Sequence, residues 1–191
     1  MAKDMIAVMD LEWTAWEGSH ARKWSGPDEE MELVQIGALK LQDDDGLTEI
    51  DGLDILVKPR INPDLSDYFI NLTGITQALL DAEGFDFPAA LDQLKAFFGD
   101  DTKVVYSWGR DYKVIQENCR LNGLDFPFDV ALFSDAREIL APIVGPEVTS
   151  VDSSQLPGAM GFDGPVTSHQ GIDDCRCIAE TLRILRSRGA F

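Results

Sequence analysis

The first part of the chain alternates between apolar and polar positions in the way that β-strands do. Apolar-rich segments with a period near two cover residues 6–14, 32–41 and 50–59. The acidic stretch 43–46, which ends in glycine, is typical of a hairpin turn between the second and third segments. Three consecutive strands of this kind predict an antiparallel meander.

Beyond residue 63 the apolar spacing becomes helical, with strands between the helices. Leu91, Leu94 and Phe98, for example, recur at helical spacing. This order indicates a mixed α/β domain, with a central five-stranded sheet flanked by helices. The predicted helices begin near residue 64 and cover 87–98, 109–122, 132–140, 153–160 and 171–188, the further strands are 103–107 and 126–131, and 142–154 is expected to be the least regular stretch.

Length and composition are those of one globular domain. The 191 residues are 45% hydrophobic and 26% charged, and no apolar run approaches the ~20 residues that a membrane span needs. The apolar run after Lys3 is too short for a signal peptide. The three cysteines match no zinc-site spacing, so we expect buried free thiols. We therefore expect a single domain over residues 1–191, a cytoplasmic location and no membrane partner.

The net charge restricts the classes of partner. Sixteen Lys and Arg residues against thirty-four Asp and Glu residues give a net charge of −18. A protein of this charge repels the nucleic-acid backbone, which argues against broad, sequence-blind binding along it. A short or single-stranded end that is held at a metal site remains compatible with the charge.

Two carboxylates spaced by two positions end the first strand. Asp10 and Glu12 point to one face of a strand, and Leu11 between them points to the other. Neighbouring anions repel one another, and a cation between them removes the repulsion. The pair is therefore either the polar end of a strand or one half of a metal site.

Two further aspartates lie at predicted helix starts. Asp111 shares a helix face with apolar residues. Its negative charge either only stabilises the positive end of the helix dipole or points into a functional site. In the last helix, at about 100° per residue, Asp173 lies nearly opposite the apolar side and Asp174 lies at its edge. Asp174 is therefore the acid expected to face the rest of the protein. A partly buried acid there needs a partner, and a cation could fill that role.

Several separated motifs follow one another in a recognisable order. They are Asp10-Leu11-Glu12, Trp108-Gly109 with Asp111, His169 five residues before Asp174, and the phrases ELVQIGA (32–38), LTGIT (72–76) and GIDD (171–174). In this order they resemble the DEDDh family of 3′-5′ exonucleases, and most of all its Eri1/KapD-like exoribonuclease branch. One departure is the link from Gly109 to Asp111, which is one residue shorter than is usual in that family.

The resemblance implies an RNase H-like fold and hydrolysis of single-stranded RNA or short oligonucleotides from the 3′ end, which releases nucleoside 5′-monophosphates. It implies two bound ions, Mg²⁺ or Mn²⁺, both of which suit oxygen ligands. Asp10 would bridge the two ions. Glu12 and Asp174 would complete the ligand set of one ion, and Asp111 would hold the other ion. His169 would be the general base, a role that suits an imidazole of pKa ~6.5 near neutral pH.

Substrate contacts and partners follow from the same resemblance. The residues implied to lie near the terminal nucleotide are Leu11, Trp13, Thr14, Leu72, Thr73 and Trp108. The expected partner is the 3′ end of a single-stranded nucleic acid, with RNA favoured over DNA, and the oligomer considered is a homodimer.

Two other functions stay open at this point. One is the trimming or proofreading of DNA 3′ ends, because the same residues serve both nucleic acids and only contacts to the 2′-hydroxyl separate them. The other is a regulatory binding protein that keeps the exonuclease fold with weak turnover, which the net charge of −18 favours.

Overall fold

The computed structural model describes residues 4–164 and 170–190, which are organised around a five-stranded sheet. In the spatial order β3-β2-β1-β4-β5, β2 pairs antiparallel with β1 and β3, whereas β4 pairs parallel with β1 and β5. The predicted mixed sheet, with its first three strands antiparallel, is confirmed. The strands are β1 (Met5–Trp13), β2 (Leu33–Gln42), β3 (Glu49–Leu56), β4 (Thr102–Ser107) and β5 (Phe133–Asp135).

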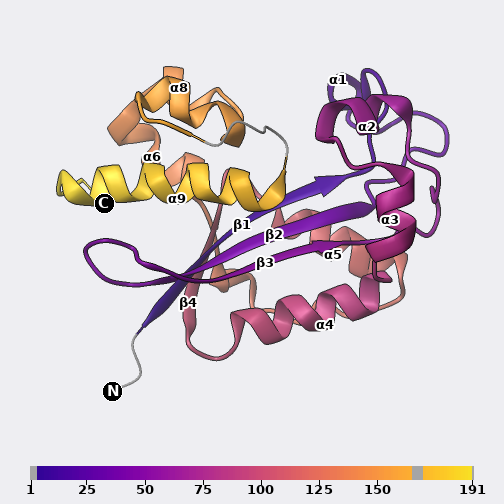
Figure 1. Cartoon of the computed structure of the whole chain (residues 1–191), viewed down its shortest axis with the longest axis horizontal. Helices are drawn as coiled ribbons and strands as arrows, with labels where there is room; N and C mark the ends of the chain where they lie inside the picture. The colour runs from indigo at the N-terminus through magenta and orange to yellow at the C-terminus, as the bar shows by residue number, and fades with distance from the viewer. Residues whose placement is uncertain (1–3, 165–169, 191) are drawn as a thin grey trace.

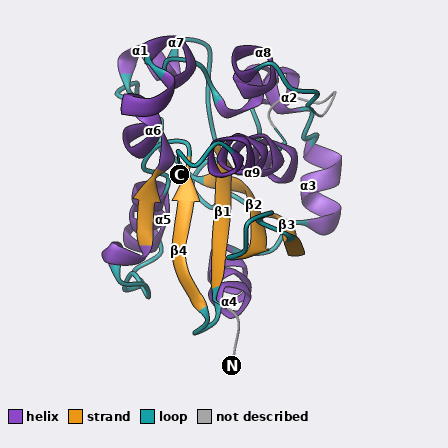
Figure 2. Ribbon diagram, turned by 90° about the vertical axis from the view of Figure 1, so that its left-hand side faces the viewer, coloured by secondary structure: helices purple, strands orange, loops and turns teal. Residues whose placement is uncertain are grey.

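Helices cover both faces of this sheet. They are α1 (Ser19–Arg22), α2 (Asp67–Thr73), α3 (Gln77–Glu83), α4 (Phe87–Phe98), α5 (Tyr112–Leu121), α6 (Ala136–Val144), α7 (Pro146–Thr149), α8 (Leu156–Met160) and α9 (Gly171–Ser187), with short 3₁₀ helices η1 (Val130–Leu132) and η2 (Ser153–Gln155). Figure 1 shows α6, α8 and α9 on one face and α4 and α5 on the other. In Figure 2, α9 is seen nearly end-on where it packs against β1 and β2.

The alternation of side chains along β1 decides which face its acids take. Val8 is buried in a cluster with residues of α9, whereas Met9 is buried in a cluster with residues of α4 and α5. Because side chains alternate along a strand, Asp10 and Glu12 lie on the face of Val8, towards α9. They also lie at the carboxyl end of a parallel strand pair, where α/β sheets commonly bind their ligands.

The segment after α5 differs from its prediction. Residues 126–131 do not form a strand, and the fifth strand is instead Phe133–Asp135, preceded by η1. Pro127 has no N–H to donate to a ladder, and the ring of Phe128 packs 5.5 Å from the ring of Phe98. The apolar side chains of this segment therefore fill an aromatic cluster and do not extend the sheet.

The start of α6 also differs, since the apolar spacing places it at residue 132. Asp135 caps the helix, because its Oδ1 accepts hydrogen bonds from the backbone N–H groups of Arg137 (3.0 Å) and Glu138 (3.4 Å). The helix then includes Pro142, and α7 follows inside the stretch that the sequence predicts to be least regular. The predicted helix 153–160 is split into η2 and α8, and the other predicted elements are confirmed, with shifts of a few residues at their ends.

Two expectations from composition can be compared with the structure. Cys119, Cys175 and Cys177 are free and buried, as predicted. Of the helices in the described part of the chain, none has both the length and the apolar character needed to cross a membrane.

Candidate metal centre

Three carboxylates meet where β1 ends beneath the start of α9. Asp10, Glu12 and Asp174 each offer one oxygen, and these oxygens lie within 4.8 Å of one another. Asp174 is only 1% exposed and Asp10 only 8%. Asp173 is half-buried instead and forms an ion pair with Arg176 at 3.0 Å. The helix-face argument, which turns Asp174 and not Asp173 into the protein, is confirmed.

Two glycines allow α9 to approach the sheet closely enough to bring Asp174 to β1. Gly37 of β2 is paired with Asp10 of β1. A β-carbon on Gly171, the first residue of α9, would lie 2.9 Å from the backbone nitrogen of Gly37 and 3.3 Å from the carbonyl oxygen of Asp10. Since side chains hold helix and strand backbones apart, this approach depends on the absence of β-carbons.

A side chain of β2 fixes the start of α9. The Oε1 atom of Gln35 accepts a hydrogen bond from the backbone N–H of Gly171 at 3.0 Å, and its Nε2 donates to Oδ1 of Asp54 at 2.7 Å. The first N–H groups of a helix have no acceptor within the helix. Gln35 supplies that acceptor from the sheet and so fixes the first turn of α9. Asp174 lies in the same turn, so its position is fixed as well.

Asp111 belongs to the same cluster electrostatically. It is the N-cap residue of α5, just after β4, and its side chain makes no capping hydrogen bond to that helix. Burial first, and the carboxylate of Asp135 second, raise the pKa of Asp111 to about 7, against the lowering effect of the Arg137 guanidinium. Asp111 in turn raises the pKa of Asp10. It lies outside the group of oxygens within 4.8 Å of one another.

Burial and mutual repulsion also raise the pKa values of the two strand acids. Burial raises the pKa of Glu12 to about 8, with Asp174 and Asp111 as the next causes. Burial, followed by the charge of Asp111, raises the pKa of Asp10 well above its ordinary range. Several buried carboxylates in one place are costly in their charged form unless positive charge joins them.

The donor set fits a hard divalent cation. Among the described residues, the atoms that converge are carboxylate oxygens, the ligands that Mg²⁺ and Mn²⁺ prefer. Two oxygens bound to one Mg²⁺ at about 2.1 Å each lie at most about 4.2 Å apart. Oxygens within 4.8 Å of one another therefore need only small side-chain rotations to share an ion.

Sequence reasoning missed three residues beside these acids. The guanidinium carbon of Arg137 lies 5.6 Å from the centre of the Trp108 ring. Asp152 adds a negative charge near Glu12 and raises its pKa. Ser153 donates a hydrogen bond to Asp10 although 143 positions separate them in the sequence. All three come from stretches without a motif, so no local signal marks them.

The predicted substrate residues near β1 differ in how far they are buried. Leu11 packs among the core residues against α4 and α5. Trp13 is half-buried, with its ring 6.0 Å from that of Trp24. Thr14 is buried, and its Oγ1 donates to the carbonyl oxygen of Glu30 at 2.5 Å. Contact of these residues with a nucleotide stays a prediction.

The other predicted substrate residues come from α2 and from the end of β4. Leu72 is half-buried, and the buried Thr73 donates from Oγ1 to the carbonyl oxygen of Phe69 at 3.0 Å. The indole Nε1 of Trp108 donates to the carbonyl oxygen of Val151 at 2.8 Å. Their substrate contacts also stay predictions. His169, the predicted base, lies outside the described residues.

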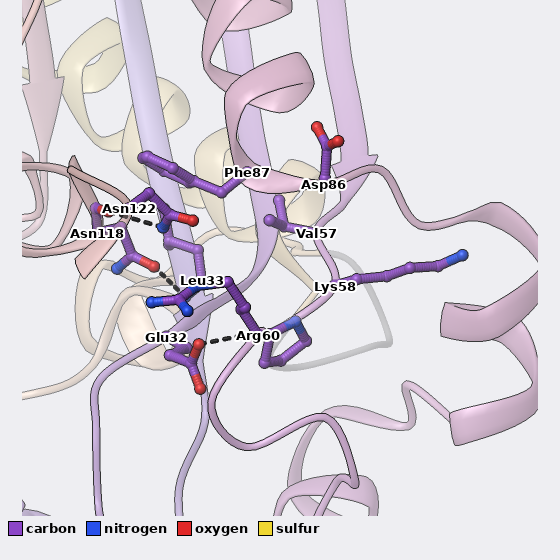
Figure 3. Close-up of a pocket in the computed structure, with 10 residues that line it drawn as sticks. Glu32, Leu33, Val57, Lys58, Arg60, Asp86, Phe87, Asn118 and Asn122 are labelled. Atoms are coloured by element: carbon purple, nitrogen blue, oxygen red, sulfur yellow. Dashed lines mark hydrogen bonds between the residues drawn. The ribbon is translucent and has the colours of Figure 1, made fainter. Parts of the chain in front are cut away.

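A cavity of about 230 Å³ opens on a different part of the sheet (Figure 3). Its polar groups already serve the fold, because the Glu32 carboxylate accepts backbone N–H groups of residues 60–62 at 2.6 to 2.8 Å. Asn118 likewise accepts the N–H of Leu33 at 3.0 Å. Leu33 packs in the cluster with α4 and α5, away from the face that carries the acids. The predicted site residues that the structure describes do not line this cavity.

Comparisons with known sequences assign the chain to a family. The model of the family RNase_T, described as Exonuclease, matches residues 7–182. The chain is 27% identical over 129 residues to the probable 3′-5′ exonuclease KapD of Bacillus subtilis, covering 67% of this chain and 59% of that protein. It is 25% identical over 185 residues to 3′-5′ exoribonuclease 1 of Rattus norvegicus, covering 92% of this chain and 51% of that protein. The chain thus spans less than two thirds of the length of these relatives.

Comparisons of structure agree with the family match. The nuclease domain of 3′hExo, a DEDDh family member bound to rAMP, superposes with a TM-score of 0.83 at 25% identity, covering 99% of this chain and 94% of that one. Exonuclease I shares the fold at a TM-score of 0.69 and 13% identity, covering 97% of this chain and 41% of that one. The RNase H-like fold implied by the resemblance is therefore confirmed. With its family match over residues 7–182, its carboxylate cluster and this fold, the chain belongs to the RNase_T exonuclease family, among the DEDDh 3′-5′ exonucleases.

Proposed function

We propose that this chain hydrolyses single-stranded RNA or short oligonucleotides from the 3′ end and releases nucleoside 5′-monophosphates, with divalent metal ions as cofactors. The observation that carries the proposal is the convergence of Asp10, Glu12 and Asp174 oxygens within 4.8 Å. The family to which the chain belongs supports the reaction class, hydrolysis of a phosphodiester.

The proposal assigns a role to each acidic residue. Asp10 contributes ligands to two ions, Mg²⁺ or Mn²⁺. Glu12 and Asp174 complete the first set of ligands, and Asp111 contributes the second. When bound, the ions supply the positive charge that stabilises an in-line displacement at phosphorus and the leaving 3′ oxygen. His169, five residues before Asp174 in the sequence, accepts a proton from the attacking water.

The choice of RNA is supported by the names of the relatives. The rat relative is an exoribonuclease, and a structure at TM-score 0.81 and 25% identity concerns recognition of a histone mRNA stem-loop by a 3′-exonuclease. For this chain, preference for RNA is part of the proposal. So is the placement of the terminal nucleotide near Trp13, the Leu72–Thr73 pair and Trp108.

The test is 3′ shortening of a 5′-labelled single-stranded oligoribonucleotide in the presence of Mg²⁺ or Mn²⁺. We expect a ladder of products with wild type and none in EDTA. Asp10→Asn and Asp174→Asn should each abolish shortening. Asp173→Asn is the matched control, since it changes the adjacent acid, which pairs with Arg176 and lies outside the group of three converging oxygens. Equal shortening by the Asp174 and Asp173 variants would contradict the proposal.

The same assay separates the two alternatives. Matched DNA and RNA oligonucleotides of one sequence, compared by kcat/KM, identify a DNA 3′-end exonuclease if DNA is preferred. Metal binding without shortening of either oligonucleotide would point to a regulatory protein with the exonuclease fold.

Two further expectations remain to be tested in solution. We propose a cytoplasmic location, which the three free, buried thiols support because disulfides are rare there. The predicted homodimer is tested by light scattering of the purified chain across a range of concentrations.

A further inference from the structure

A serine outside the acidic motifs contacts the central acid of the site. Ser153, the first residue of η2, donates from its Oγ to Oδ1 of Asp10 at 3.1 Å. When they are charged, the carboxylates around Asp10 repel its own negative charge. The Ser153 hydroxyl acts in the opposite sense, because the hydrogen bond that it donates stabilises the charged Asp10 carboxylate.

The segment that carries Ser153 is held in place by several contacts. On one side of Ser153, the carbonyl oxygen of Val151 accepts the Trp108 indole N–H at 2.8 Å. On its other side, Leu156 is completely buried in the cluster that includes α9. Trp108 follows β4, the strand paired with β1. The sheet that carries Asp10 therefore also fixes the position of its hydrogen-bond donor.

The Ser153 hydroxyl is not needed to form the turn in which it lies. The 3₁₀ turn is closed by a reciprocal capping box between Asp152 and Gln155, in which the N–H of Asp152 donates to Oε1 of Gln155 at 3.2 Å. A serine that served only this turn would direct its hydroxyl to the turn's own backbone. Ser153 directs it to Asp10 instead.

We infer that Ser153 is a positioning residue for Asp10, and that it holds one carboxylate oxygen so that the rest of the carboxylate faces the divalent ions. The inference rests on the metal site of the proposed function. A carboxylate has about four lone-pair positions on its two oxygens. Ser153 occupies one, so both oxygens keep lone pairs for metal ions.

The physical reason is the repulsion within the cluster. Glu12, Asp111 and Asp174 all act on Asp10 through their charges. Without an anchor, the Asp10 side chain would rotate away from them, and binding an ion would have to reverse that rotation. Hydrogen bonds that orient metal ligands in this way commonly change metal affinity by about 10-fold to 100-fold when they are removed.

The experiment measures Mn²⁺ affinity of the whole chain by isothermal titration calorimetry, so it does not depend on activity. We expect Ser153→Ala to weaken Mn²⁺ binding by about 10-fold or more. Ser154→Ala removes the neighbouring hydroxyl and should bind Mn²⁺ as wild type does. Ser153→Thr keeps the hydroxyl and should recover most of the affinity. Circular dichroism in EDTA verifies that each variant is folded.

The outcomes separate this inference from the proposed function. Equal Mn²⁺ affinity of Ser153→Ala and Ser154→Ala would overturn the role of Ser153, as would a Ser153→Thr variant as weak as Ser153→Ala. Wild-type protein that binds no Mn²⁺ would overturn both proposals. Mn²⁺ binding that depends on Ser153, without shortening of any oligonucleotide, would support Ser153 and overturn the proposed function alone.

Discussion

Gly37 and Gly171 lie in direct backbone contact, so that a β-carbon on Gly37 would lie only 2.2 Å from the carbonyl carbon of Gly171. Gly37 is also the β2 partner of Asp10. The first turn of α9 therefore rests on the strand pair that carries the first acid of the site. Three residues later, the same helix supplies Asp174.

Gly37→Ala should separate α9 from the sheet. The added β-carbon would overlap backbone atoms, which cannot rotate away, so we expect a loss of about 1–3 kcal/mol or more in the free energy of unfolding. Metal affinity and exonuclease activity should fall with it, because Asp174 moves away from Asp10. Urea unfolding and Mn²⁺ titration measure the two effects.

Gly52→Ala is the matched control for this substitution. Gly52 is a glycine of β3, where a β-carbon would lie 3.4 Å from the flexible Cδ1 of Ile172. We expect its Mn²⁺ affinity to equal that of wild type. A Gly37→Ala protein as stable and as active as Gly52→Ala would contradict the role of the glycine contact.

Gln35→Leu should loosen the start of α9 without adding bulk to it. The change leaves the buried N–H of Gly171 without the acceptor that it has at 3.0 Å, a loss of about 1–3 kcal/mol in stability. Because Asp174 follows in the first turn, Mn²⁺ affinity should weaken as well.

Gln42→Leu provides the comparison for Gln35→Leu, because Gln42 ends the same strand and donates to Asp44 in the hairpin. It should leave Mn²⁺ binding unchanged. If both leucine variants bind Mn²⁺ equally well, the contact between Gln35 and Gly171 does not position the metal ligands.

Without metal ions, the protein should become less stable as the pH rises. The folded-state pKa values of Glu12, about 8, and Asp111, about 7, lie above the ~4 of these groups in an unfolded chain. Between about pH 4 and pH 8 the folded state therefore binds more protons than the unfolded state, so the free energy of unfolding falls as the pH rises. Melting temperatures in EDTA across this range measure the slope.

Two comparisons test the cause of that slope. Glu12→Gln removes one of the titrating groups and should make the slope shallower. Excess Mg²⁺ should make it shallower too, because the ion binds the deprotonated carboxylates. A slope that neither Glu12→Gln nor Mg²⁺ changes would assign the pH dependence to groups elsewhere in the chain.

Asp111→Asn should remove one of the two proposed ions and leave the other bound. Asp111 lies outside the group of three oxygens within 4.8 Å, so its loss should spare the ion held by Glu12 and Asp174. We expect the stoichiometry of Mn²⁺ binding to fall from two to one, and activity to fall by about 100-fold or more, since a metal contributes several kcal/mol to such a transition state. Two ions bound by Asp111→Asn would remove Asp111 from the ligand set.

The sequence predicted most of the sheet because strand periodicity is local. Alternating apolar positions and a hairpin turn defined β1, β2 and β3. The same rule was wrong at residues 126–131, because the apolar side chain of Phe128 packs against Phe98 in an aromatic cluster. Periodicity reports that side chains are buried, and it does not report which element buries them.

Helical periodicity also distinguished Asp174 from Asp173. Counting along the last helix placed Asp174 at the edge of the apolar side, and Asp174 is 1% exposed. The order of the acidic motifs then indicated the family. Both results depend only on spacing along the chain, which is why they could be obtained before any tertiary contact was known.

The tertiary structure alone decided how these acids are held together. The contacts of Ser153 with Asp10 and of Gln35 with Gly171 join residues separated by 143 and 136 positions, and the raised pKa values arise from charges on different elements. Such contacts depend on how closely α9 and η2 approach the sheet. Spacing along the chain determined which acids face inward, and packing between distant segments determined that they meet.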